Sequence, residues 1–255
     1  MPLTRPSRRR SQPEAAPSRS RVVLAAALRL IVGGIAIWAL LCVIGLVLTH
    51  VLDKGPFHRA DLGVDIWFVH HRTKTWDRIF LFGTDMARTE TVVIVAAVVA
   101  VLLRLLTGRW RESLILVLSV VGEVLIFLSV TATVPQRRPP VPRLLPAPPT
   151  SAFPSGHTGA SVAMYGCLAI LLLANYGRHP VARVAAVVLF CVPVFVATSR
   201  LYEGEHYPSD VVAGALLASL WLTCVLHVVP IRARQAVLER PTVGLASGEP
   251  ASGPS

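Results

Sequence analysis

The chain has 255 residues, of which 53% are hydrophobic and only 15% are charged. Soluble domains have about a quarter of their residues charged, so this composition excludes an ordinary soluble protein and favours a chain embedded in a bilayer. The formal net charge is +11, but nothing beyond this charge indicates nucleic-acid binding. We expect no nucleic-acid partner, because membrane topology explains the basic residues better.

A basic segment rich in Pro and Ser precedes the first apolar run. Residues 1–21 contain six arginines and one acid, Glu14. A secretory signal has a short apolar core and a small-residue cleavage site, whereas this segment leads directly into a full-length span. We therefore expect residues 1–21 to be a disordered cytoplasmic tail. Residues 22–232 are then the membrane domain, and residues 233–255 a second, flexible cytoplasmic tail.

Six apolar runs approach the roughly 20 residues that a helix needs to cross a bilayer. They lie near residues 30–49, 91–106, 113–133, 158–174, 181–198 and 211–229. The fold class that we predict is all-α integral membrane, a six-transmembrane-helix bundle with both termini on one side. The four cysteines lie within these runs without a short Cys-x-x-Cys spacing, so we expect buried thiols, with neither disulfides nor a metal site.

The loops between the runs orient the bundle. With a cytoplasmic N-terminus, the inner segments at 108–112 and 175–180 are basic, as the positive-inside rule requires, and so is the C-terminal tail. The outer segment 50–90 has nearly balanced charge and carries several Trp and Phe residues. This composition is typical of a helix lying on the membrane surface. Segment 136–143 breaks the rule with three arginines on the outside, which favours a functional role for it.

Three short polar stretches lie beside ends of apolar runs, and the predicted topology places all of them at the extracytoplasmic end. His206 and Asp210 are four residues apart, so on one helix the carboxylate can hold one ring N–H and leave the other nitrogen free to attack. Ser155 and Gly156 open a helix, where free backbone N–H groups bind an anion. The full stretches are Arg138-Pro139, Pro154-Ser155-Gly156-His157 and Ser199-Arg200 followed by His206 and Asp210.

Two arginines and a second histidine can complete such an anion site. Arg138 and Arg200 can clamp the non-bridging oxygens of a phosphate through paired hydrogen bonds. His157 is then left to protonate the departing oxygen. Each stretch alone is more often a helix cap, a surface ion pair or an arginine that reaches the head groups. Their occurrence together indicates a phosphate-handling site.

In their order and in their placement relative to six spans, these stretches resemble the three-part signature of the type 2 phosphatidic acid phosphatase (PAP2) family, over about residues 30–229. The resemblance implies a mechanism that needs no metal ion or other cofactor. It also implies that His206 is the nucleophile, that Asp210 orients it and that His157 is the general acid. The residues that it implies for phosphate binding are Arg138, Ser155, Gly156 and Arg200.

One position departs from the family pattern. The first motif usually starts with a lysine seven residues before its arginine, and this position is Thr131 here. No lysine follows Lys74 in the chain, so Arg137 and Arg143 are the candidates to supply the missing charge.

Three acids have no assigned role. Glu123, in the middle of a span, is either a proton or substrate group or a neutral or paired structural one. Glu203 and Glu205 lie beside His206, where they oppose anion binding and raise the pKa of the histidine. Alternatively they face solvent or pair with Arg137 or Arg143.

We therefore expect a lipid phosphatase integral to a bacterial plasma membrane, with a phosphohistidine intermediate at His206. Its expected partners are a lipid phosphate and the surrounding membrane lipids, and the sequence leaves the oligomeric state open. Polyprenyl diphosphate is the first choice of substrate, because carrier recycling needs dephosphorylation at the outer face. Phosphatidate and phosphatidylglycerol phosphate are close alternatives. The alternatives from other classes are an enzyme similar to vanadium-dependent haloperoxidases, which hold vanadate with similar residues, and a non-catalytic lipid-binding or transport protein.

Overall fold

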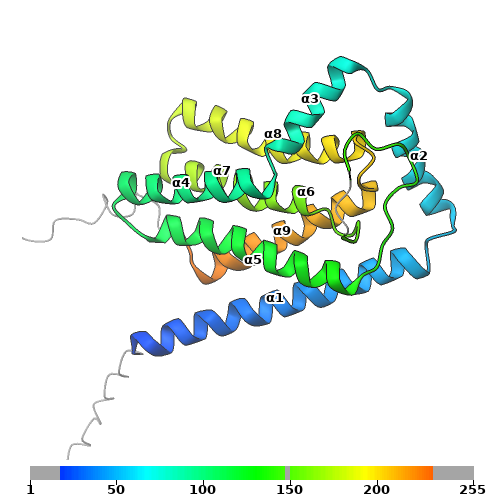
Figure 1. Cartoon of the computed structure of the whole chain (residues 1–255). Helices are drawn as coiled ribbons and strands as arrows, with labels where there is room; N and C mark the ends of the chain where they lie inside the picture. The colour runs from blue at the N-terminus through cyan, green and yellow to red at the C-terminus, as the bar shows by residue number, and fades with distance from the viewer. Residues whose placement is uncertain (1–17, 147–149, 232–255) are drawn as a thin grey trace, which may run out of the picture.

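The structure, a computed structural model, describes residues 18–146 and 150–231. Within these residues the regular elements are all helical and no β-strand is present, which confirms the predicted fold class. Figure 1 shows the helices packed side by side, with two shorter ones across one end of the bundle. In chain order they are α1 (Arg19–His50), α2 (Pro56–His70), α3 (Lys74–Asp85), α4 (Thr89–Thr107), α5 (Arg111–Thr133), α6 (Gly156–Ser161), the π-helical turn η1 (Val162–Gly166), α7 (Cys167–Tyr176), α8 (Pro180–Tyr202) and α9 (Pro208–Val228).

The six predicted spans are confirmed as helices long and apolar enough to cross a membrane: α1, α4, α5, the continuous stretch α6–η1–α7, α8 and α9. The largest difference is at the first span, which begins at Arg19 rather than near Leu30. Residues 19–21 of the predicted tail are therefore helical. The rest of that tail lies outside the described residues, apart from Ser18, and so does the tail predicted for 233–255.

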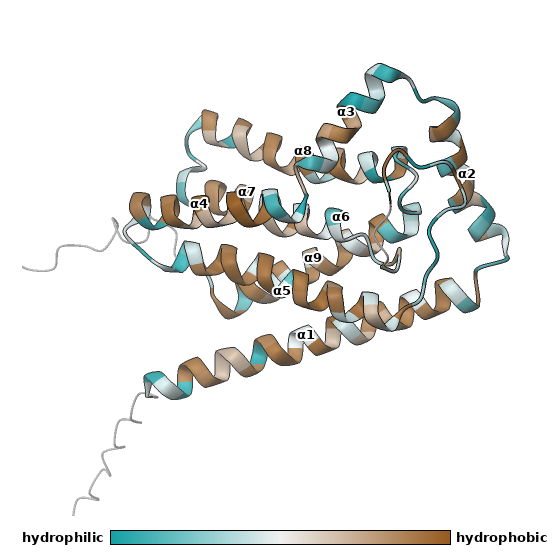
Figure 2. Cartoon of the chain, in the orientation of Figure 1, coloured by the Kyte–Doolittle hydropathy of each residue, from teal (hydrophilic) through white to brown (hydrophobic). Residues whose placement is uncertain are grey.

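Apolar side chains lie on both the inner and the outer faces of the spans. Leu41, Ile115 and Leu217 are fully buried between helices and belong to the core. Leu105 and Leu106 near the end of α4 are each 72% exposed, which suits contact with hydrocarbon chains better than contact with water. The brown colouring along the long helices in Figure 2 shows the same pattern.

The connection between the first two spans forms two helices, α2 and α3, which lie across the end of the bundle (Figure 1). Arg72, between them, donates a hydrogen bond of 3.0 Å from Nε to the Tyr202 carbonyl and one of 2.6 Å from Nη1 to the Pro142 carbonyl. The rings of Phe80 and Tyr202 pack 4.4 Å apart. These contacts hold α2 and α3 over the end of α8. Trp67 and Trp76 are about half exposed, as expected of helices at a membrane surface.

Candidate active site

All three polar stretches lie at one end of the bundle. α5 ends at Thr133 and α6 begins at Gly156, while α8 ends at Tyr202 and α9 begins at Pro208. Because neighbouring spans alternate in direction, these four helix ends meet at the end covered by α2 and α3 (Figure 1). The prediction that the stretches share one end of the bundle is confirmed. The side of the membrane that this end faces stays a prediction.

A cavity of roughly 350 Å³ lies at this end and brings most of the predicted site residues together. Its charged and imidazole side chains come from Arg138, His157, Arg200, His206 and Glu123, and it also includes the hydroxyl residues Thr89, Thr150 and Ser151. Its apolar lining comes mainly from α4 and α5. Gly156 also lines the cavity, whereas Ser155 and Asp210 are fully buried behind it. The cavity thus joins two cations and two imidazoles to a wall of hydrocarbon, contributed by Val92, Val93, Val120, Val124, Phe127 and Leu128.

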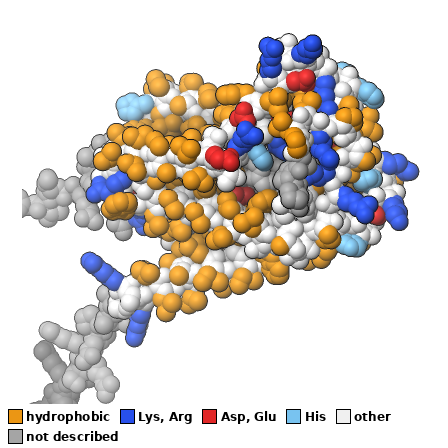
Figure 3. Space-filling view, in the orientation of Figure 1, with side chains coloured by type: hydrophobic (Ala, Val, Ile, Leu, Met, Phe, Trp, Pro, Cys, Tyr) orange, Lys and Arg blue, Asp and Glu red, His pale blue; other side chains and the backbone are white. Residues whose placement is uncertain are grey.

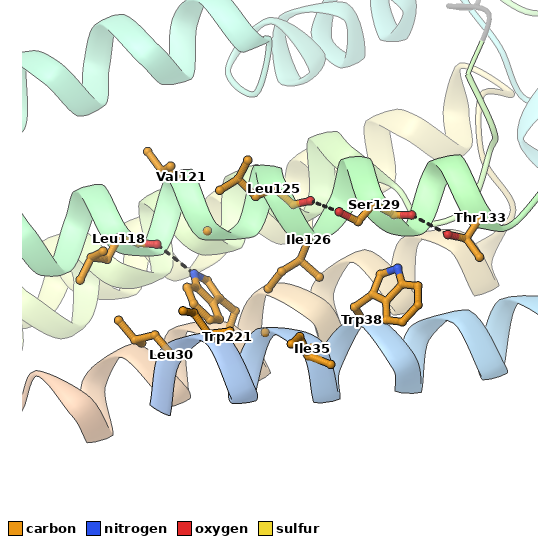
Figure 4. A pocket seen from close by; sticks show the side chains of 13 residues that line it. Leu30, Ile35, Trp38, Leu118, Val121, Leu125, Ile126, Ser129, Thr133 and Trp221 are labelled. Carbon is orange, nitrogen blue, oxygen red and sulfur yellow. Dashed lines mark hydrogen bonds between the residues drawn. The ribbon is translucent and has the colours of Figure 1, made fainter. Parts of the chain in front are cut away.

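A larger groove, of roughly 600 Å³, lies between α1, α5 and α9 (Figure 4). Its lining is apolar apart from two hydroxyl and two indole groups, and all of these except the indole of Trp38 have hydrogen-bond partners among the described residues. Trp221 donates a hydrogen bond of 2.9 Å from Nε1 to the Leu118 carbonyl, and Ser129 donates one of 2.8 Å to the Leu125 carbonyl. None of the described residues that line this groove is charged. The groove therefore offers no chemistry for phosphate, despite its size.

His206 is held in one tautomer, but by a different partner from the predicted one. Its Nδ1 lies 2.7 Å from the carbonyl oxygen of Ala152, and because a carbonyl can only accept, Nδ1 carries the proton. The nearest oxygen of Asp210 is 3.7 Å from Nδ1, beyond hydrogen-bond distance. The predicted hydrogen bond from His206 to Asp210 is therefore wrong in this structure. Its consequence still holds, since Nε2 is left unprotonated in the neutral ring.

Asp210 fixes the start of α9 instead. One carboxylate oxygen accepts a hydrogen bond of 2.9 Å from the backbone N–H of Tyr207, and the other accepts one of 2.9 Å from Nε2 of Gln136. The helix starts at Pro208, as proline favours at the first helical position. His206 consequently lies before the helix, so the prediction that it shares a helical face with Asp210 is wrong. The carboxylate acts as a cap that links α9 to the loop after α5.

The surroundings of His206 keep its imidazole neutral. Its side chain is almost completely buried. Burial lowers the pKa of His206 well below its usual value, and the positive charges of Arg200 and Arg138 lower this pKa further. At neutral pH the Nε2 atom of His206 therefore carries a free lone pair. The prediction that the neighbouring acids raise the pKa of His206 is wrong.

Those two acids are buried and hold the arginines of the site. Glu203 and Glu205 are 0% and 1% exposed, so the alternative that they face solvent is wrong. Arg200 Nη1 lies 2.6 Å from a carboxylate oxygen of Glu203, and Arg138 Nη1 lies 2.8 Å from one of Glu205. Thr84 of α3 donates a hydrogen bond of 2.6 Å to the other oxygen of Glu203. The acids thus pair with Arg138 and Arg200, and not with Arg137 or Arg143 as the sequence analysis also allowed.

Burial shifts the pKa of the paired groups that lie outside the spans, and the pairing opposes these shifts. Burial lowers the pKa of Arg138, and the charge of Glu205 opposes this shift. Burial raises the pKa of Glu203, against the effects of Arg200 and of the Thr84 hydroxyl. An arginine keeps its proton through such shifts, so the guanidinium groups stay cationic and are held in place by fixed carboxyl groups.

The first residues of α6 line the cavity. Ser155 is the residue before the helix, and its hydroxyl lies 3.0 Å from that of Thr158. Gly156 and His157 are the first helical residues, whose backbone N–H groups have no partner within the helix. A Cβ atom at Gly156 would stand 2.7 Å from the ring of Phe127. Glycine is therefore required here by the close packing of α5 against α6, in addition to any role in binding an anion.

The three auxiliary candidates lie outside the cavity. Arg137 and Arg143 are exposed, and neither lines the cavity. The hydroxyl of Thr131 is buried and has no hydrogen-bond partner among the described residues. The structure therefore shows no substitute at this cavity for the lysine that is absent from position 131.

Sequence reasoning missed three partners of the site: Gln136, the Ala152 carbonyl and Thr84. A backbone carbonyl leaves no signal in a sequence, and Thr84 contacts Glu203 across 119 positions of the chain. Gln136 could have been noticed in the sequence, because it is a polar residue directly before the arginines at 137 and 138. Among the described residues, no group of three or more His, Cys, Asp or Glu side chains is arranged to hold a metal ion.

Comparisons with known proteins give information on the family and the fold. Residues 114–234 match the sequence profile of the PAP2 superfamily, and no curated protein matches the chain. Among solved structures, the chain is similar to a transmembrane PAP2-type phosphatidylglycerolphosphate phosphatase from Bacillus subtilis. The TM-score is 0.66 at 17% identity, over 76% of this chain and 94% of that one. This likeness shows that the two proteins share a fold. The predicted resemblance is confirmed by this profile match, whose residues 114–234 contain every predicted site residue.

Proposed function

We propose that the protein is a membrane lipid phosphatase that works through a covalent phosphohistidine at His206. The observation that carries the proposal is the composition of the cavity, in which Arg138, Arg200, His157 and His206 adjoin an apolar wall from α4 and α5. A phosphate head group needs the first set of residues and a lipid tail needs the second. The PAP2 match and a solved phosphatase of the same fold support a phosphatase whose mechanism requires no metal ion.

The surface of the molecule supports a substrate that stays in the bilayer. Figure 3 shows apolar side chains along the flanks of the bundle, and many of the charged side chains gathered toward the end that carries α2 and α3. The cavity lies at this end, and its wall includes Val93 and Leu128, whose side chains are more than half exposed. A lipid can therefore keep its tail against the apolar flank while its head group reaches the two arginines.

The reaction follows from the placement of the four groups. The guanidinium groups of Arg138 and Arg200 neutralise the non-bridging phosphate oxygens, together with the backbone N–H groups at the start of α6. Nε2 of His206 attacks phosphorus in line with the leaving oxygen, which takes a proton from His157 as its bond to phosphorus breaks. Water then attacks the phosphohistidine and gives a proton to His157. This step releases phosphate and restores both histidines.

The experiment that tests this function is a phosphate-release assay in detergent with polyprenyl diphosphate, phosphatidate and phosphatidylglycerol phosphate. We expect the wild type to release phosphate from at least one lipid. We expect His206→Ala to release none, and a quench in alkaline detergent to trap a base-stable, acid-labile phosphoprotein only when His206 is present. Binding of these lipids without phosphate release by the wild type would indicate a non-catalytic protein. Halide oxidation that depends on added vanadate would favour the haloperoxidase-like alternative.

A further inference from the structure

One polar residue in the cavity has no role in the phosphatase chemistry. Glu123 lies in the middle of α5, is 1% exposed and lines the same cavity as His157 and His206. Among the described residues, its carboxyl group has no hydrogen-bond or ion-pair partner. Burying a carboxyl group without a partner costs free energy. A ligand atom in the cavity is the partner that remains for it.

The contacts of Glu123 with α6 show how far its carboxyl group lies from the start of that helix. Its carboxyl oxygen packs directly over Gly159, where a Cβ atom would collide with it. Gly159 lies three residues beyond Gly156, which is roughly 4.5 Å deeper along the helix axis at about 1.5 Å per residue. Phe127, four residues after Glu123 on the same face of α5, packs against Gly156 itself. The carboxyl group therefore lies about one helical turn further along α6 than Gly156, where the start of the helix is proposed to bind phosphate. We call this start of α6 the phosphate cradle.

The wall around this carboxyl group is otherwise apolar. Val120, Val124 and Leu128 line the cavity beside it. With these apolar neighbours and no ion-pair partner, a carboxyl group costs least in its neutral form, which offers one O–H donor and one carbonyl acceptor. Such a group can bind either a hydroxyl or an ester oxygen. A hydrocarbon chain offers this carboxyl group no hydrogen bond.

We propose that Glu123 forms a hydrogen bond with the oxygen that a glycerol phosphate carries on the carbon next to its phosphoester carbon, so that the site prefers glycerolipid phosphates to polyprenyl diphosphates. The inference rests on the proposed function. That oxygen is a free hydroxyl in the head group of phosphatidylglycerol phosphate and an ester in phosphatidate. In both lipids it lies a few covalent bonds from the reacting phosphorus, which suits a partner one turn below the cradle.

A polyprenyl diphosphate presents different chemistry at the same depth. Beyond its reacting phosphate come a second anionic phosphate and then hydrocarbon. The second phosphate brings negative charge toward the carboxyl group, and the hydrocarbon leaves that group without a partner. The first choice of substrate made from the sequence is therefore the less favoured one on this reasoning.

The test compares four substrates in the full-length protein: phosphatidate, phosphatidylglycerol phosphate, polyprenyl diphosphate and a long-chain alkyl phosphate that lacks the glycerol oxygen. We expect Glu123→Leu to lower kcat/KM for the glycerol lipids about tenfold, the effect of one lost hydrogen bond. We expect its kcat/KM for the other two substrates to stay within about twofold of the wild type. Glu123→Gln keeps a donor and an acceptor, so it should retain most of the activity. Val124→Ala, in the same wall, controls for a change of shape.

The two glycerol lipids distinguish the oxygen that is bound. A loss confined to phosphatidylglycerol phosphate indicates the hydroxyl, and a loss confined to phosphatidate indicates the ester. An equal loss for all four substrates, or none for the glycerol lipids, overturns the inference. If Glu123→Leu does not fold, Glu123→Met replaces it, and a wild type that hydrolyses the alkyl phosphate as well as phosphatidate overturns the inference without any variant. A wild type that hydrolyses none of the substrates refutes the proposed function instead.

Discussion

Nη1 of Arg138 lies 2.8 Å from a carboxylate oxygen of Glu205, so a guanidinium group predicted to clamp phosphate is already held by an anion of the protein itself. The same carboxylate oxygen lies 3.7 Å from Nη2 of Arg200. Glu205 therefore lies between Arg138 and Arg200 and pairs with both guanidinium groups before a substrate binds. Such fixed cations need no reorganisation when the charge of the transition state develops.

Replacing Glu205 with Gln tests this positioning role. The substitution leaves two buried guanidinium groups with one carboxylate fewer, so we expect a lower Tm and a loss of kcat of about tenfold or more. The freed positive charge should also bind free anions better. We therefore expect inorganic phosphate to inhibit Glu205→Gln at a lower concentration than it inhibits the wild type, and to raise its Tm by more. A purely structural role for Glu205 would lower Tm without any change in phosphate inhibition.

Asp210→Asn separates a helix cap from a histidine-orienting carboxylate. The Ala152 carbonyl, not Asp210, accepts the proton of His206 Nδ1, so the tautomer should survive this substitution. We expect a loss of about 1 kcal/mol of stability from the weakened cap at Tyr207 and a fall in kcat of roughly tenfold. If Asp210 acted directly on the imidazole, kcat would fall by about 10⁴, as when the carboxylate of a catalytic triad is removed.

The fold was largely predictable because each span is a local property of the sequence. Apolar runs of sufficient length, together with the charge of the loops, predict six helices and bring Arg138, His157 and Arg200 to one end. The pairing within the site was not predictable in the same way. Glu203 and Glu205 pair with the clamps because α8 ends at Tyr202 and the chain folds back on itself, which a helical pattern does not encode. Two of their partners, Arg138 and Thr84, come from segments distant in the sequence, whereas Arg200 lies only three residues before Glu203.

The start of α9 illustrates the same limit on a smaller scale. Four residues separate His206 from Asp210, and this spacing suggested a shared helical face. Pro208 moves the start of the helix past His206, because proline at the first helical position costs no hydrogen bond. The backbone carbonyl of Ala152 then takes the place predicted for the carboxylate. A one-turn spacing in a sequence implies a contact only when both residues lie within the same helix.

The pH dependence of kcat/KM should report the ionisation of His206. Only the neutral imidazole can attack, and burial together with Arg200 and Arg138 lowers its pKa well below the usual 6.5. Activity is present above that lowered pKa and is lost as the pH falls through it, so we expect the acid limb of the profile well below pH 6.5. In Arg138→Gln one of the charges that lower this pKa is removed, and the limb should move upward. A wild-type limb at or above pH 6.5 would contradict the neutral histidine that this structure implies.

His157→Ala should have an effect that depends on the leaving group. As the general acid, His157 protonates the departing alkoxide of a lipid, so its loss should lower kcat for lipid phosphates by about 10²–10⁴. An aryl phosphate leaves as a stable phenolate and needs little protonation, so its hydrolysis should fall much less. Parallel assays with a lipid phosphate and an aryl phosphate measure this difference. Equal losses on both substrates would indicate that His157 binds phosphate instead of donating a proton.

Thr131→Lys tests what the missing lysine means for this site. The Thr131 hydroxyl is buried near the end of α5 without a hydrogen-bond partner, two turns beyond Glu123 on the same face of the helix. A lysine side chain is long enough to extend from this position toward the cavity and add a third cation for the phosphate. We expect Thr131→Lys to lower KM and to raise kcat/KM several-fold. Thr131→Val removes the unpaired hydroxyl without adding charge, so it should leave kcat/KM unchanged and slightly raise Tm. A Thr131→Lys variant that folds but has an unaltered or higher KM would show that Arg138 and Arg200, held by their acids, already saturate the phosphate.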